Sequence, residues 1–95
     1  MKIINVALTI DTAKRAEYEQ FIDELVQGSR GAAGHRDYAH YRRLGSDAQY
    51  EIIEHWADAA AVEFHNGTPH FQKFLAHVGD YLVKDPEIIR MDYEG

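Results

Sequence analysis

The chain has 95 residues, no cysteine and a formal net charge of −6 at pH 7. This length suits one domain with one hydrophobic core, residues 1–95. The lack of cysteine excludes disulfides, a thiolate nucleophile and a cysteine-based zinc site, and the negative charge argues against nucleic acid as a partner, because it repels phosphate backbones.

The first strand is expected at residues 2–10, where apolar side chains occupy both faces. The N-terminal run MKIINVALTI is too short to span a membrane, and it lacks a small-residue cleavage site. We therefore expect no secretory signal, no membrane partner and a cytoplasmic location.

A helix is expected after this strand, with Asp11 or Thr12 as its N-cap. Apolar residues recur at helical spacing and predict one buried face. They are Tyr18, Phe21, Ile22, Leu25 and Val26. The glycine-rich run 28–34, GSRGAAG, predicts the end of the helix, because glycine is costly inside a helix.

A hairpin is expected next, with strands at about 35–44 and 49–56 and a turn at 45–48. Symmetric closure at this turn would set Arg42 opposite Glu51. The fold places the first of these strands at a sheet edge, where charged side chains deter unwanted strand pairing. Its basic residues are Arg36, Arg42 and Arg43, and an anion-binding role for them is the alternative.

Two short helices and a last strand complete the chain. Asp58 is expected to cap a helix that runs to about Asn66, and Thr68 with Pro69 starts the second helix. The apolar positions of the second helix are Phe71, Phe74, Leu75, Val78 and Leu82. The strand EIIRMDY begins after Pro86.

The order β-α-β-β-α-β predicts an α+β fold of the ferredoxin-like type, with an antiparallel sheet and helices on one face. The helices cover only one face, yet the last strand offers Ile88 to one face and Ile89 and Met91 to the other. A large apolar face left in water marks an interface. We therefore expect a homodimer that packs sheet against sheet.

Three residues near the strand-to-helix corner are candidates for chemistry. Glu54 and Trp56 share one strand face, so a cavity on that side would raise the pKa of Glu54 and make it a possible base. His65 falls on the apolar stripe of the short helix, with Ala61 and Phe64. It is either a core-edge histidine bonded to a carbonyl or an imidazole able to move a proton.

Asn5 is unusual in an otherwise apolar strand. A buried amide without partners costs about 1–3 kcal/mol. Asn5 therefore either pairs with a neighbouring side chain or points into a polar pocket. The histidines His65, His70 and His77 match no metal-ligand spacing, so we expect no metal site.

Residues 50–74, YEIIEHWADAAAVEFHNGTPHFQKF, resemble the antibiotic biosynthesis monooxygenase family, which includes small quinol monooxygenases. The matching positions are Tyr50, Glu54, Trp56, Asp58, Ala61, His65, His70 and Phe71. AGHRDY, residues 33–38, is similar to the family's second strand, although His35 stands where many relatives carry a smaller polar residue.

This resemblance implies a dimeric α+β barrel with a cavity between sheet and helices. It also implies oxygenation of a small phenolic or quinol substrate by O2, with no flavin, haem or metal cofactor. The catalytic residues implied are His65 as base or proton shuttle, with Trp56 and Asn5 holding the substrate. The implied pocket residues are Tyr38, Glu54, His70 and Phe71.

Other functions fit the same fold group. A haem-degrading enzyme would use His65 or His70 as axial ligand, and an isomerase of a phosphorylated sugar would need the arginines as an anion site. A dimeric binding domain without activity is the alternative from a different class, because fold alone transfers function poorly. A buried ionisable pair in the cavity would favour an enzyme.

Overall fold

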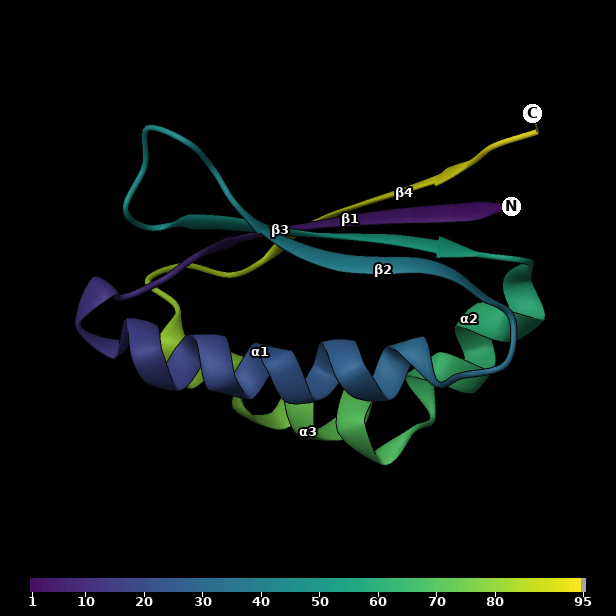
Figure 1. Cartoon of the computed structure of the whole chain (residues 1–95), viewed down its shortest axis with the longest axis horizontal. Helices are drawn as coiled ribbons and strands as arrows, with labels where there is room; N and C mark the ends of the chain where they lie inside the picture. The colour runs from purple at the N-terminus through teal and green to yellow at the C-terminus, as the bar shows by residue number, and fades with distance from the viewer. Residues whose placement is uncertain (95) are drawn as a thin grey trace.

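The computed structural model describes residues 1–94, in which three α-helices lie on one side of a four-stranded antiparallel sheet (Figure 1). The elements in chain order are β1 (Lys2–Thr9), the 3-10 helix η1 (Thr12–Lys14), α1 (Arg15–Arg30), β2 (His35–Arg42), β3 (Gln49–Trp56), α2 (Ala59–Asn66), α3 (Pro69–His77), the 3-10 helix η2 (Val78–Tyr81) and β4 (Glu87–Asp92). Among these residues no helix is both long enough and apolar enough to cross a membrane.

The strand order in the sheet is β2-β3-β1-β4, which confirms the predicted ferredoxin-like α+β fold with β2 at one edge. The hairpin between β2 and β3 differs from the prediction by one residue. Arg42 lies opposite Tyr50, and Glu51 lies opposite Tyr41. The reason is that the loop closes around residues 44–48, where the Arg43 N–H donates to the Gln49 carbonyl.

Side-chain caps start the helical segments where the sequence predicts them. The carboxylate of Asp11 accepts from the Ala13 N–H before η1, and that of Asp58 accepts from the Ala61 N–H before α2. Thr68 caps α3. Each cap satisfies a backbone donor that the helix itself leaves unpaired.

Helix α1 ends at Arg30, inside the predicted glycine-rich stop at 28–34, and its last turn includes Gly28. Tertiary contacts hold this last turn. Ser29 is fully buried, and Arg30 Nε donates to the Tyr38 carbonyl at 3.0 Å. Gly28 lets the His70 ring approach, since a Cβ there would lie 2.7 Å from ring atoms. Packing thus overrides the low helix propensity of glycine.

The core lies between the helices and the inner face of the sheet. All five predicted α1 residues are buried, as are alternate residues of β1 and β3. Two predicted stripe residues are exposed: Phe64 is 60% exposed and Leu75 is 56% exposed. Each of the two short helices, α2 and α3, therefore leaves one predicted apolar side chain in solvent.

The outer face of the sheet has no helix over it (Figure 1). Its register places Ile53 and Ile89 on either side of Asn5, and Met91 beside Ile3. Ile89 is 59% exposed and Met91 is 43% exposed. The predicted two-sided apolar sheet is therefore present, and one of its faces is open.

Candidate active site

Strand β3 carries Glu54 and Trp56 on its inner face, toward the helices, because strand residues two apart share a face. Both side chains are buried, at 4% and 0% exposure. The Trp56 indole N–H donates to Glu54 Oε1 at 2.9 Å. Glu54 is therefore a buried carboxyl group, and the Trp56 indole gives it a hydrogen bond in place of water.

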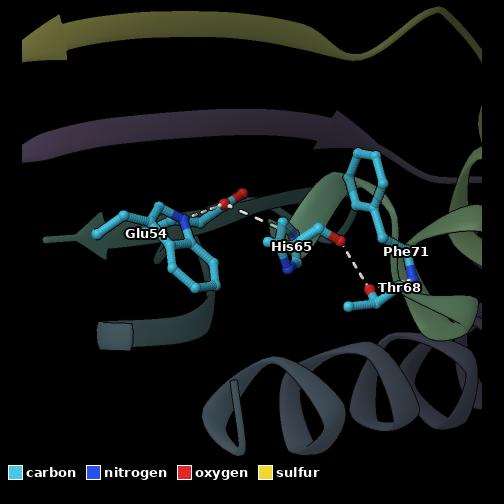
Figure 2. Close-up of polar contacts among 5 residues, drawn as sticks. Glu54, His65, Thr68 and Phe71 are labelled. Carbon is cyan, nitrogen blue, oxygen red and sulfur yellow. Dashed lines mark hydrogen bonds and ion pairs between the residues drawn. The ribbon is translucent and has the colours of Figure 1, made fainter. Parts of the chain in front are cut away.

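His65 lies in the last turn of α2 and faces the same carboxylate (Figure 2). Thr68 fixes the backbone there, since its hydroxyl donates to the His65 carbonyl at 2.7 Å and accepts from the Phe71 N–H. The distance from His65 Nε2 to Glu54 Oε1 is 4.0 Å, which is too long for a hydrogen bond. Within residues 1–94 neither ring nitrogen of His65 has a hydrogen-bond partner.

Aromatic rings enclose His65 on several sides. Its ring centroid lies 4.6 Å from that of Trp56, 4.8 Å from Phe71, 5.5 Å from Tyr38 and 5.9 Å from His70. Only 1% of His65 is exposed. The imidazole therefore lies in apolar surroundings next to a buried carboxyl group.

Burial shifts the two groups in opposite directions, because it disfavours both charged forms. It raises the pKa of Glu54 from 4.5 to about 7, although the Trp56 N–H and the positive charge of Arg90 act the other way. Burial lowers the pKa of His65 from 6.5 to about 4, and His70 adds to this effect. Near neutral pH the histidine is neutral and Glu54 can gain or lose a proton.

A cavity of about 410 Å³ opens beside Glu54, between the sheet and helices α2 and α3, and neither His65 nor Trp56 is among its lining residues. Ligand pockets typically have about 300–1,000 Å³. The charged groups that line it are Glu54, Asp85 and Arg90. Its apolar wall consists of Ile4, Val6, Ile52, Val62, Phe71, Phe74, Leu75, Val78 and Ile88.

The structure brings most of the expected site residues together. Tyr38 lies opposite Glu54 in the β2–β3 register and lines the cavity with Glu54 and Phe71. Burial, followed by the nearby Glu54 charge, raises the pKa of Tyr38. His70 lies behind His65, against α1, and does not line the cavity. The Trp56 indole, which the resemblance assigns to a substrate oxygen, donates its N–H to Glu54 in this structure.

Asn5 lies on the opposite side of the sheet from Trp56 and His65. It pairs with Ile53 and Ile89, and the alternation along β1 turns its side chain to the outer face. The expected joint role of Asn5 and Trp56 in one pocket is therefore incompatible with this chain's register. Asn5 Oδ1 is buried and has no hydrogen-bond partner in residues 1–94.

The residues considered for a metal, haem or anion site do not form such a site at this cavity. No group of three or more His, Cys, Asp or Glu side chains in residues 1–94 could hold a metal ion. His65 is sealed among rings, so it could not serve as an axial haem ligand without repacking. Arg36, Arg42 and Arg43 do not line the cavity.

Arg90 is the site residue that sequence reasoning missed. It lies on β4 and lines the cavity with Glu54. The sequence held one signal: Arg90 is the only cation in the segment EIIRMDY, and it lies two residues after Ile88 and so shares its strand face. The register needed to place it opposite Ile4 came only with the structure.

Comparison with known proteins gives a consistent result. The family model described as antibiotic biosynthesis monooxygenase matches residues 1–77. The Bacillus subtilis (strain 168) protein named "Putative monooxygenase YcnE" is 30% identical over 92 residues, which cover 97% of each chain.

Solved structures share the fold. One described as an antibiotic biosynthesis monooxygenase has a TM-score of 0.91 at 21% identity, over 100% of both chains. Rv0793 from Mycobacterium tuberculosis has a TM-score of 0.92 at 18% identity, over 99% of this chain and 95% of that one. At these identities the structural likeness supports the fold alone.

The buried carboxyl group predicts a pH-dependent stability. Between pH 4.5 and about 7 the folded protein retains the Glu54 proton that the unfolded chain has released. The contribution of Glu54 to the free energy of unfolding therefore falls as pH rises through this window, by up to about 3 kcal/mol. The contribution of His65 to the free energy of unfolding rises with pH, because its pKa is lowered. The effect of Glu54 is therefore isolated by comparing wild type with Glu54→Gln in urea unfolding from pH 4.5 to 8.

The wild-type protein should lose stability relative to Glu54→Gln across that window. Glu63→Gln, which changes an exposed carboxylate on α2, is the matched control. If the free energy of unfolding of the wild type instead rose with pH relative to that of Glu54→Gln, the burial of an uncompensated carboxylate would be contradicted.

Proposed function

Because the chain belongs to the antibiotic biosynthesis monooxygenase family, we propose that it is a cofactor-independent monooxygenase. Its substrate is a small phenolic or quinol-type aromatic molecule, and its oxidant is O2. The observation that carries this proposal is that Glu54 lines a mostly apolar cavity and has the buried His65 behind it as its ionisable neighbour. A domain that only binds a hydrophobic molecule has no need of such a pair, which costs stability.

Glu54 is the proton acceptor in this proposal. A base works best when its pKa lies near the working pH, and the pKa of Glu54 is about 7. His65, whose pKa is about 4, is neutral at that pH and leaves the carboxylate without a cation on that side. The Trp56 N–H orients the carboxylate and moderates its basicity.

The substrate supplies the electrons. Loss of a proton to Glu54 gives an electron-rich anion, which passes one electron to O2. The resulting radical pair couples to a peroxide on the ring. Loss of water from the peroxide leaves one oxygen atom on the ring as a hydroxyquinone, and the two substrate electrons reduce the other atom to water. The apolar wall excludes bulk water during these steps.

Oxygen uptake with a reduced quinol tests this function. Glu54→Gln should lower kcat/KM by about 100-fold or more, as expected for loss of a general base. Trp56→Phe removes the hydrogen bond that stabilises the carboxylate and so raises the pKa of Glu54. The pH at which activity reaches half its maximum should therefore rise by roughly 1–2 pH units. His65→Ala should lower the rate less than Glu54→Gln does.

His77→Ala is the matched control, because His77 is an exposed histidine at the end of α3. Wild-type protein that consumes no oxygen with any quinol, yet binds one, would favour the alternative of a binding domain. Equal rates in wild type and Glu54→Gln would remove Glu54 from the chemistry.

The homodimer is also part of this proposal. The outer face of the sheet presents Ile53, Ile89 and Met91 around Asn5, whose buried Oδ1 has no partner in residues 1–94. A two-fold contact sets the same patch of both copies together. A second copy would cover the apolar side chains and could supply a donor to Asn5.

The dimer proposal predicts the effect of Asn5→Asp. A carboxylate in the middle of the outer face should drive the solution mass from two chains to one, because charge burial without a partner is costly. Asn5→Leu, of similar size, should remain a dimer. Light scattering after gel filtration measures both. A wild-type mass of one chain would contradict the proposed dimer.

A further inference from the structure

Arg90 is the only cation among the residues that line the cavity. Its guanidinium has no carboxylate within 4 Å and no hydrogen bond in residues 1–94. The nearest acid along the same face of β4, Asp92, is bonded to Lys2 at 2.6 Å. The five donors of Arg90 are therefore free for a ligand.

Arg90 and Glu54 flank one residue of the sheet. Ile4 is the register partner of Glu54 on β3 and of Arg90 on β4, so the three side chains lie in a row on the inner face. Neighbouring strands are about 4.8 Å apart, which separates the backbones of Glu54 and Arg90 by roughly 10 Å. Both residues line the main cavity. Ile4 forms an apolar floor between them.

Arg90 also lines a second hollow in the surface. This space of about 300 Å³ shares Ile4, Val62 and Arg90 with the main cavity. Arg90 thus lines both hollows, and a ligand in the main cavity meets this residue at the point where they join. Asp85 is the other acid of the cavity, and it forms no ion pair with Arg90 among the described residues.

We propose that Arg90 selects the substrate: the site takes a 1,4-dihydroxy aromatic molecule as its monoanion, with the ionised oxygen on Arg90 and the remaining hydroxyl facing Glu54. This inference rests on the proposed function and extends it to substrate recognition. A planar guanidinium favours an anionic oxygen over a neutral one. The ring lies over Ile4, with one oxygen at each end.

The placement also assigns the proton. The Glu54 carboxylate takes the proton of the hydroxyl that faces it. The electron-rich anion that results gives O2 one electron and becomes a semiquinone radical, while O2 becomes superoxide. A substrate with a hydroxyl at one edge only would lack the group that Arg90 holds, and it should bind weakly.

The test measures binding, without turnover, through the fluorescence of the single tryptophan, Trp56. The probes are 4-hydroxybenzoate, an air-stable ring with a hydroxyl opposite an anionic oxygen, and its neutral analogue 4-hydroxybenzamide. Wild-type protein should bind 4-hydroxybenzoate about 10- to 100-fold more tightly than 4-hydroxybenzamide, as expected for a charge-assisted contact.

Arg90→Met should abolish that preference, and Arg90→Lys should restore part of it. Arg36→Met, which changes an exposed arginine outside the cavity, should keep the preference. Equal binding of both probes by the wild type, or an unchanged preference in Arg90→Met, overturns the role of Arg90. These results do not depend on oxygen uptake, so a protein that discriminates the probes but consumes no oxygen refutes only the proposed reaction.

Discussion

Glu54 is 4% exposed, and the Trp56 indole is the one side-chain donor bonded to it in residues 1–94. A carboxylate withdrawn from water needs such compensation, and one neutral N–H is less than ion pairing would give. His65 provides no cation, since it is buried as well and its own pKa is lowered. The site therefore contains an acid whose charge is tolerated only marginally. Its ability to gain and lose a proton near neutral pH follows from that constraint.

The fold could be predicted because local signals and the global arrangement agree. Asp58 caps α2, Pro69 opens α3, and the α1 stripe is wholly buried. The errors occurred where tertiary contacts outweigh local preference. The hairpin register follows the Arg43–Gln49 hydrogen bond, and the exact end of α1 within 28–34 depends on the His70 ring that packs against Gly28. Neither contact is visible in the sequence, since each joins residues through the fold.

The site was predicted in part. Alternation along β3 was enough to place Glu54 and Trp56 together, and the strand-to-helix corner brought His65 to them. The role that the resemblance implied for Asn5 beside Trp56 did not take the sheet face of Asn5 into account, because an amide in an apolar strand indicates a special environment without saying on which side. Arg90 was missed because its relation to Glu54 passes through Ile4, across two strand pairings. Which residues pair across neighbouring strands could be known only from the three-dimensional structure.

The titration of the Glu54 carboxyl carbon, followed by nuclear magnetic resonance in ¹³C-labelled protein, tests the central claim most directly. Glu54→Gln identifies the signal by its disappearance. The buried site predicts a midpoint near pH 7, with the His65 ring still neutral at that pH. A midpoint near 4.5, the value of an exposed glutamate, would mean that water or a cation reaches the carboxylate, and it would contradict the account given for this site.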